Sequence, residues 1–230
     1  MDKGAAVVVS PHHHRHTGPT ACHHGRGQSV LKGIVDQRPL PKPKNALSLT
    51  ELVEAVESEL QQPREPGYSL EKHIVLRELL DGDWRELERF AFADRTQLYT
   101  RNLVATDHET YALILIVWNP GKYSPIHDHP CDGCWVKVIA GCANEVRYQI
   151  QDHKLVEVDN ATFAHGVTYM HDDFGLHKMG NPSSSTDAVT LHLYSPPYPK
   201  CQIWFDEGDA TKSSEARPCY FSEYGERVVK

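Results

Sequence analysis

Apolar and polar positions divide the chain into three parts that differ in periodicity. Before residue 48 the apolar residues follow no helical or alternating period, and Pro and Gly interrupt the segment repeatedly. From there to about residue 93 they recur at helical spacing, and beyond it they form short runs separated by turn residues. The sequence therefore predicts a disordered arm, 1–47, and a single domain, 48–230, which is helical at about 48–93 and a β-barrel at about 94–226.

The helical part opens with a capping-box pattern, Ser48-Leu-Thr-Glu51, whose two polar side chains can satisfy free N–H groups at a helix start. Apolar residues then follow at helical spacing, namely Leu49, Leu52, Val53, Val56 and Leu60. A second helix is expected at about 70–80, and a short third helix opens at another capping-box pattern, Asp83-Trp-Arg-Glu86. We expect these helices to cap the barrel.

Six segments after residue 94 have the composition of strands: 98–104, 111–118, 135–139, 142–149, 154–158 and 189–194. Turn sequences such as Asn119-Pro-Gly121 and Gly180-Asn-Pro182 lie between them. Many short strands at fairly regular spacing are typical of a sandwich or barrel. The expected fold is therefore mainly β, an antiparallel β-barrel with a helical N-terminal cap.

Composition and charge disfavour several classes of protein. The formal net charge of −7 disfavours a strongly basic nucleic-acid binder and a chain drawn to acidic membranes by its charge. The longest apolar run, near residues 113–118, is far shorter than the ~20 residues of a spanning helix, and the first 30 residues lack the apolar core of a signal peptide. Six cysteines are too few for a disulfide scaffold. We expect a cytoplasmic protein with no nucleic-acid or membrane partner.

The arm differs in charge from the rest of the chain. Residues 1–47 contain seven Lys or Arg and two acidic residues, together with six of the 15 histidines: His12, His13, His14, His16, His23 and His24. Three interpretations stay open: a solvated tail, adventitious metal capture, and a specific metal or targeting role.

The strongest local signal for chemistry is His127-Asp128-His129. Alternate residues of a strand point to the same face, so two imidazoles about 6.6 Å apart along that face can converge on one metal ion. The pattern alone is weak, because two surface or hydrogen-bonded histidines would produce it as well. A third ligand is needed, and His177 is the candidate, with Asn181 four residues later.

Two stretches around these histidines resemble the paired motifs of the cupin family. The first is Gly121, His127, His129, Cys134 and Gly141, with Cys134 where the family usually has Glu. The second is Gly166, Asp172, Phe174, His177 and Asn181, in which the usual Pro and inner Gly are absent. The resemblance implies a cupin-type jelly-roll barrel that holds a metal.

The replacement of Glu by Cys134 changes the expected chemistry of the site. Three neutral imidazoles would leave Fe(II) with its full charge and with three open positions if it is octahedral. Such a site favours an anionic chelating substrate, because the substrate then neutralises the charge. A thiolate is a suitable donor.

Further segments resemble the cysteine dioxygenase family within the cupins, over roughly residues 48–226. They are Tyr99-Thr-Arg101-Asn102-Leu-Val, His127-Asp-His129, Cys134, Gly175-Leu-His177 and Leu191-His-Leu-Tyr-Ser-Pro-Pro197. The resemblance includes the cysteine at position 134 and is therefore more specific than the general cupin pattern.

The resemblance implies a role for each of these residues. His127, His129 and His177 would bind one Fe(II) per chain. Arg101 would pair with the substrate carboxylate, with Tyr99 beside it and Trp118 as a wall of the cavity. Tyr194 would present its phenol to the open face of the iron and be joined to Cys134 by a thioether. His192 would orient Tyr194, Thr190 would supply a hydroxyl where the family often has Ser, and Ser195-Pro196 would be a cis peptide.

Strand periodicity agrees with part of this arrangement. Thr190, His192 and Tyr194 fall on one face of a strand by period two, and so do Tyr99 and Arg101. A planar guanidinium can hold a carboxylate through two hydrogen bonds and so fixes its orientation as well as its charge.

The function implied is Fe(II)-dependent dioxygenation of the thiol of L-cysteine by O2 to the sulfinate, a step in cysteine catabolism and taurine biosynthesis, by a monomer. Two alternatives stay open. One is a dioxygenase for 3-mercaptopropionate or another small thiol, although the resemblance implies Gln at position 101 in enzymes for 3-mercaptopropionate. The other is a non-catalytic metal-binding cupin, which would not need a substrate clamp.

Overall fold

The computed structural model describes residues 47–61, 85–170 and 175–228. Its helices are the α-helix α2 (Leu49–Leu60) and the 3₁₀-helix η2 (Arg85–Phe90). Its strands are β1 (Tyr99–Thr106), β2 (Ala112–Trp118), β3 (Ile126–His127), β4 (Gly133–Ala140), β5 (Ala143–Gln151), β6 (Lys154–Phe163), β7 (Val167–Met170), β8 (Leu176–Gly180), β9 (Ala188–Ser195), β10 (Cys201–Trp204), β11 (Ser213–Ala216), β12 (Ser222–Glu223) and β13 (Glu226–Arg227).

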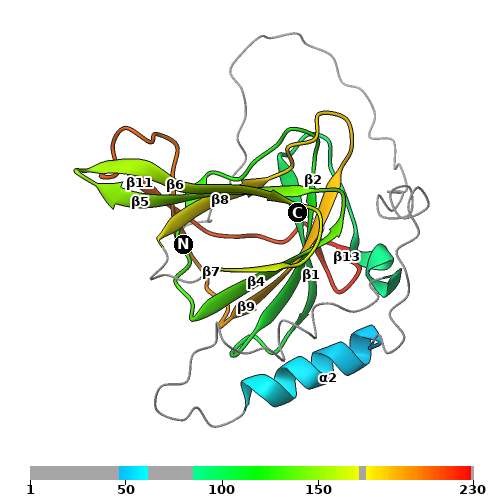
Figure 1. Ribbon diagram of the computed structural model, residues 1–230. Coiled ribbons are helices and arrows are strands. Elements are labelled where there is room, and N and C mark those ends of the chain that lie inside the picture. Colours follow the sequence, from blue (N-terminus) through cyan, green and yellow to red (C-terminus); the bar gives the residue numbers. More distant parts are fainter. Residues whose placement is uncertain (1–46, 62–84, 171–174, 229–230) are drawn as a thin grey trace, which may run out of the picture.

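The strands form two facing sheets. One has the order β13-β12-β1-β2-β9-β4-β7 and the other the order β11-β10-β3-β8-β5-β6. Neighbouring strands are antiparallel except β1 and β12, which are parallel. In Figure 1 the layer with β5, β6 and β8 lies across the layer with β1, β4 and β9, and α2 lies outside the second layer. The expected fold, a mainly β cupin-type barrel with a helix at its N-terminal side, is confirmed.

The central strands of the larger sheet are buried on both faces. Every residue of β2 and of β9 is buried. One face of this pair packs in a cluster with α2, through residues such as Leu115 and Leu191, while the other carries Trp118 and Tyr194 toward the interior of the barrel. Burial on both sides explains why residues 113–118 read as a continuous apolar run instead of an alternating one.

Helix α2 is defined by local sequence and held by packing. The Ser48 side chain accepts a hydrogen bond from the backbone N–H of Glu51, and the Glu51 carboxylate accepts one from the backbone N–H of Ser48 at 2.7 Å, which is the predicted capping box. Leu52 and Val56 are buried in the cluster beneath β2 and β9. The Tyr111 hydroxyl also donates to Glu57 at 2.8 Å. These contacts place the helix on the outer face of the sheet.

Shortening Leu52 to Ala is expected to lower the free energy of unfolding by about 2–5 kcal/mol, because a fully buried leucine leaves a cavity. Chemical denaturation of the two proteins would measure the difference. Glu54→Ala is the matched control, because Glu54 is exposed on the same helix and its replacement should change stability by less than about 0.5 kcal/mol. Equal losses in both variants would contradict the packing of α2 on the barrel.

The structure also corrects or leaves open several expectations. The short third helix is a 3₁₀-helix from Arg85 to Phe90, while Asp83, the helix expected at about 70–80 and the arm up to residue 46 lie outside the described residues. All six predicted strands are present. Seven further strands were not predicted, and each has only two to five residues: β3, β7, β8, β10, β11, β12 and β13.

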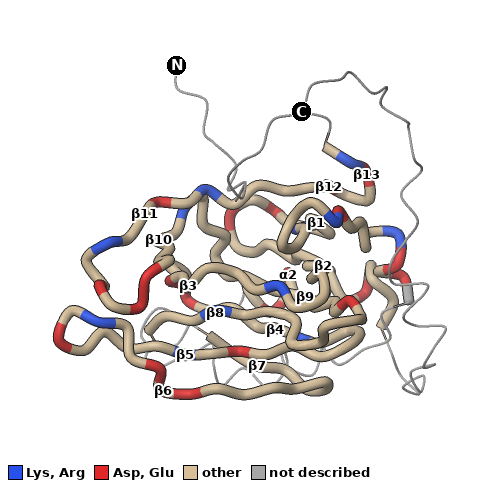
Figure 2. The backbone as a smooth tube through the Cα atoms, turned by 90° about the horizontal axis from the view of Figure 1, so that it is seen from above, with Lys and Arg blue, Asp and Glu red and all other residues tan. Residues whose placement is uncertain are grey.

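Charged residues lie mostly in turns and on the outer strands of the sheets, as along β6 in Figure 2, whereas β2 and β9 contain none. Among the described residues no helix has both the length and the hydropathy that crossing a membrane requires.

Candidate metal centre

Three histidines meet between the two sheets. His127 ends β3 and His177 lies on β8, and the two residues are directly opposite each other in the antiparallel pairing of these strands. His129 follows β3 by two residues. Opposite residues on neighbouring strands have Cβ atoms about 4.5–5.5 Å apart, so the pairing brings two of the three imidazoles together.

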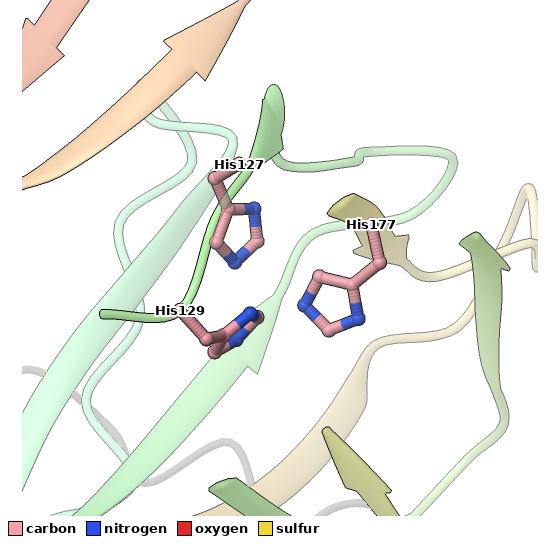
Figure 3. A group of neighbouring side chains, drawn as sticks. All are labelled: His127, His129 and His177. Carbon is pink, nitrogen blue, oxygen red and sulfur yellow. The ribbon is translucent and has the colours of Figure 1, made fainter. Parts of the chain in front are cut away.

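The three rings surround one point. Their centroids are 4.9 Å apart for His127 and His129, 4.7 Å for His127 and His177, and 4.4 Å for His129 and His177. One nitrogen from each ring lies within 4.8 Å of the others, and Figure 3 shows the rings directed toward a common space. Among the described residues this is the group of His, Cys or acidic side chains that could hold a metal ion.

The remaining ring nitrogens are partly engaged by the protein. Nδ1 of His127 lies 3.0 Å from the carbonyl oxygen of Pro125, and Nδ1 of His177 lies 2.6 Å from Oε1 of Glu145. Both partners are acceptors, so each Nδ1 carries the proton and donates it, and each Nε2 is left with its lone pair. Nδ1 of His129 is buried and has no hydrogen-bond partner among the described residues.

Burial keeps these imidazoles neutral at neutral pH. It lowers the pKa of His127 to about 4, although the Pro125 carbonyl acts in the opposite direction. Burial and the neighbouring histidines hold the pKa values of His129 and His177 well below the ordinary value. A metal ligand must be the neutral imidazole. Three neutral nitrogen donors, two of them on fully buried histidines, therefore fit a divalent transition metal.

The expectation that both histidines of the His-x-His pair lie on one strand is wrong. Strand β3 ends at His127, because the Asp128 side chain, and not a backbone carbonyl, accepts the hydrogen bond from the N–H of Gln202 at 2.8 Å. Pro130 then follows, which has no N–H with which to extend the ladder. The two rings still converge because the chain bends after the strand and directs His129 inward.

A chain of hydrogen bonds runs along the inner face of β9. Nε1 of Trp118 donates to Oγ1 of Thr190 at 2.8 Å, and this oxygen lies 2.8 Å from Nε2 of His192. Because Oγ1 accepts from Trp118, the Thr190 hydroxyl donates its hydrogen bond to Nε2 of His192. His192 then carries its proton on Nδ1, which lies 3.4 Å from the Tyr194 hydroxyl. Burial lowers the pKa of His192 well below its ordinary value, so the ring is neutral.

Cys134 and Tyr194 are neighbours across two strands. They are directly opposite each other in the antiparallel pairing of β4 with β9, and their side chains are hydrogen-bonded. Burial raises the pKa of the Cys134 thiol and that of the Tyr194 phenol well above their ordinary values. The Tyr194 ring stacks at 6.3 Å on His129, so the pair lies at the edge of the three-histidine group.

Arg101 and its neighbours line the same space. The Arg101 guanidinium carbon is 5.6 Å from the centre of the Tyr194 ring, and its buried Nε has no hydrogen-bond partner. No carboxylate among the described residues pairs with it. Although burial favours the neutral form, the phenols of Tyr194, Tyr198 and Tyr99 raise the pKa of Arg101, so the cation persists. Tyr99 packs at 4.7 Å on Trp118.

The structure thus brings together the three histidines, Arg101 and the Cys134–Tyr194 pair, and it adds two further residues. Glu145 lies on β5 and contacts His177, and the Tyr198 ring lies 5.4 Å from Tyr194 and 6.4 Å from His129. A signal for Glu145 existed, because Glu145 and Arg147 are opposite charges two residues apart on a predicted strand. Tyr198 follows β9 in a proline-rich turn, and no period marks it. The predicted cis peptide Ser195–Pro196 is present, whereas Asp172 and Phe174 of the second motif lie outside the described residues.

Two facing, mainly antiparallel sheets with three histidines between them that could hold a metal ion are typical of the cupin class. Comparison with known families makes this more specific. A family model described as cysteine dioxygenase type I matches residues 46–207, and the chain belongs to that family.

Curated relatives named cysteine dioxygenase type 1 are similar to most of this chain. Cysteine dioxygenase type 1 of Danio rerio is 32% identical over 151 residues, which are 64% of this chain and 72% of that protein. The Homo sapiens protein of the same name is 31% identical over 164 residues, which are 70% and 80% of the two chains. Among solved structures, a Cupin_2 domain of an XRE family transcriptional regulator from Enterobacter cloacae has 18% identity and a TM-score of 0.34, over 44% of this chain and 100% of that one.

Proposed function

We propose that this protein is an Fe(II)-dependent dioxygenase that converts the thiol of L-cysteine and O2 into cysteine sulfinate. The observation that carries the proposal is the placement of the Arg101 guanidinium, whose Nε is buried and which pairs with no carboxylate among the described residues, against the same tyrosine that stacks on the three-histidine group. A metal site alone would need no such cation. Family membership and the relatives named cysteine dioxygenase support the choice of reaction.

The proposed roles follow from the contacts. His127, His129 and His177 hold the iron, which when bound supplies dioxygen activation and a coordination position for the thiolate. Arg101 binds the substrate carboxylate, and Tyr99 and Trp118 form the wall beside it. This arrangement fixes the orientation of the thiol relative to the metal, so the protein contributes positioning above all.

Tyr194 and His192 hold a proton at a defined place. The bonds from Trp118 through Thr190 fix the tautomer of His192, which directs an N–H toward the Tyr194 hydroxyl. The phenol therefore keeps its own proton available as a donor toward the substrate side of the site. Because burial raises the pKa of Tyr194, this proton is retained over the whole neutral range.

The pairing of Cys134 with Tyr194 supports a thioether between Sγ and the phenol ring as a protein-derived cofactor. Intact-mass analysis of the iron-loaded, cysteine-treated protein is expected to show a species two hydrogens lighter that resists thiol reductants. Cys134→Ala should remove this species and lower the rate without abolishing it. Cys142→Ala, at a cysteine on the turn before β5, is the matched control and should retain the lighter species. A lighter species that persists in Cys134→Ala would exclude this crosslink.

Oxygen uptake tests the proposed reaction itself. The Fe(II)-loaded protein would be given L-cysteine or 3-mercaptopropionate, and the product would be weighed by mass spectrometry. Faster uptake with cysteine and a product heavier by two oxygen atoms are expected. Preference for 3-mercaptopropionate would keep the chemistry and overturn the substrate. No uptake with either at confirmed iron occupancy would favour the non-catalytic cupin.

The unit that performs this reaction is proposed to be the domain 48–230 as a cytoplasmic monomer. Deleting residues 1–47 is expected to leave iron content and the cysteine KM within about twofold, because all residues assigned to the site come from the strands and their connections. Metal analysis and steady-state kinetics of the truncated chain would measure both, and light scattering would give its mass in solution. Loss of iron on truncation would instead assign a metal role to the histidines of the arm.

A further inference from the structure

A buried carboxylate lies beside one of the three histidines and is shared among three donors. Glu145 is 4% exposed, and its Oε1 accepts the Nδ1–H of His177 at 2.6 Å. Its other oxygen, Oε2, accepts from Nη2 of Arg147 at 3.1 Å and from the Thr168 hydroxyl at 3.0 Å. One carboxylate oxygen thus accepts a hydrogen bond from the candidate metal ligand, and the other accepts from residues that hold the carboxylate in place.

The anchor joins the two sheets. Glu145 and Arg147 lie on β5 of the six-stranded sheet, where Arg147 is directly opposite His177 in the pairing with β8. Nη2 of Arg147 also donates to the Thr168 hydroxyl at 3.2 Å and to the Tyr169 carbonyl at 3.0 Å, both on β7 of the seven-stranded sheet. The carboxylate therefore cannot swing away from His177 without breaking contacts to the opposite layer.

The same network reaches the segment that carries the other side of the site. The Tyr169 hydroxyl donates to the carbonyl of Asp132 at 2.8 Å, and its ring packs at 4.9 Å on Trp135. Asp132 lies between His129 and Cys134. Residues of β5 and β7 are thus connected at one end to His177 and at the other to the backbone that holds His129.

An ion pair that served only to join the sheets would not account for this arrangement. Burial of a carboxylate is unfavourable unless it is paired and hydrogen-bonded, and Arg147 with Thr168 already meets that need through Oε2. The contact of Oε1 with His177 is an additional one. Carboxylates that accept from the far nitrogen of a metal-bound imidazole fix its tautomer and make it a stronger donor.

We propose that Glu145 is the positioning residue of His177, and that Arg147 both holds this carboxylate and moderates its charge. Glu145 keeps the proton of His177 on Nδ1, so Nε2 faces the metal. Glu145 also places a negative charge next to the metal centre. The three neutral imidazoles supply no such charge, because Cys134 stands where cupins usually have a Glu ligand. The inference rests on the proposed function only in taking the metal to be iron.

Two substitutions separate the charge from the hydrogen bond. Glu145→Ala removes the acceptor, and Fe(II) affinity is expected to fall about 10–100-fold, as for other residues that hold a metal ligand. Glu145→Gln keeps an acceptor of the same size without the charge and should give a smaller loss together with a higher Fe(III)/Fe(II) potential. Arg147→Met should shift the potential in the opposite direction, because the carboxylate then acts on His177 without a neighbouring cation.

Competition with a chromogenic Fe(II) chelator under anaerobic conditions measures the Fe(II) affinity. A redox titration followed by the electron paramagnetic resonance signal of Fe(III) measures the potential. Glu157→Gln, the same change at an exposed position of β6, is the matched control and should move neither value. Opposite shifts of potential in Glu145→Gln and Arg147→Met are the result expected, and Arg147→Lys should restore part of the wild-type value.

Wild-type affinity and potential in both Glu145 variants would overturn the proposal, and so would shifts of the same sign in Glu145→Gln and Arg147→Met. If Glu145→Ala fails to fold, Glu145→Gln decides the question. Neither the Fe(II) affinity nor the potential depends on turnover. A protein that does not oxidise cysteine would therefore contradict the proposed function, while the role of Glu145 could still be tested.

Discussion

His177→Ala is expected to leave a folded protein that binds almost no Fe(II) and oxidises cysteine at least about 1,000-fold more slowly, a loss of about 4 kcal/mol in transition-state stabilisation. The reason is geometric. His177 is opposite His127 across β3 and β8 and is the ring nearest to His129, so its removal leaves two donors and an open side. Metal analysis after gel filtration and oxygen uptake would measure the two effects.

The control for this variant must remove an imidazole without touching the site. His165 lies in the exposed turn between β6 and β7, and His165→Ala is expected to keep both iron and rate. Full iron occupancy in His177→Ala would show that the three-histidine group is not the metal centre. Equal loss in both variants would show that the effect comes from folding and not from ligation.

The parts of the fold that sequence predicts are those determined locally. Helix α2 has its capping box and its apolar stripe within the thirteen residues 48–60, and both appear in the structure as expected. Strands β2 and β9 are long apolar segments and were predicted almost to their ends. In contrast, β3, β12 and β13 have two residues each, too few to show any period. Their pairing is set by the strands beside them.

The site shows the same division. Thr190, His192 and Tyr194 share a face because they lie within one strand, so period two was sufficient to group them. His129 reaches the group after its strand has ended, which no period describes. Glu145 required knowledge of which strand lies beside β8, and this depends on the order of strands in the sheet. Sequence thus identifies residues within an element better than it identifies contacts between elements.

The second large effect is expected at Arg101. Arg101→Gln should lower kcat/KM for L-cysteine by about 100- to 1,000-fold, which corresponds to about 3–4 kcal/mol and lies in the range for truncating one partner of a buried charge pair. The cation has no carboxylate partner among the described residues, and its Nε is buried without a hydrogen bond. A substrate carboxylate would supply both. Arg217→Gln, at an exposed arginine, is the matched control and should leave the kinetics unchanged.

The division of this loss between KM and kcat reports what the guanidinium does. A rise in KM alone would mean that Arg101 binds the carboxylate equally in the ground state and the transition state. A fall in kcat as well would mean that it also fixes the thiol relative to the metal, because a mispositioned substrate reacts more slowly even when bound. An unchanged KM for cysteine would remove Arg101 from the carboxylate role and leave its buried charge to be explained by the four tyrosines around it, Tyr99, Tyr194, Tyr198 and Tyr220.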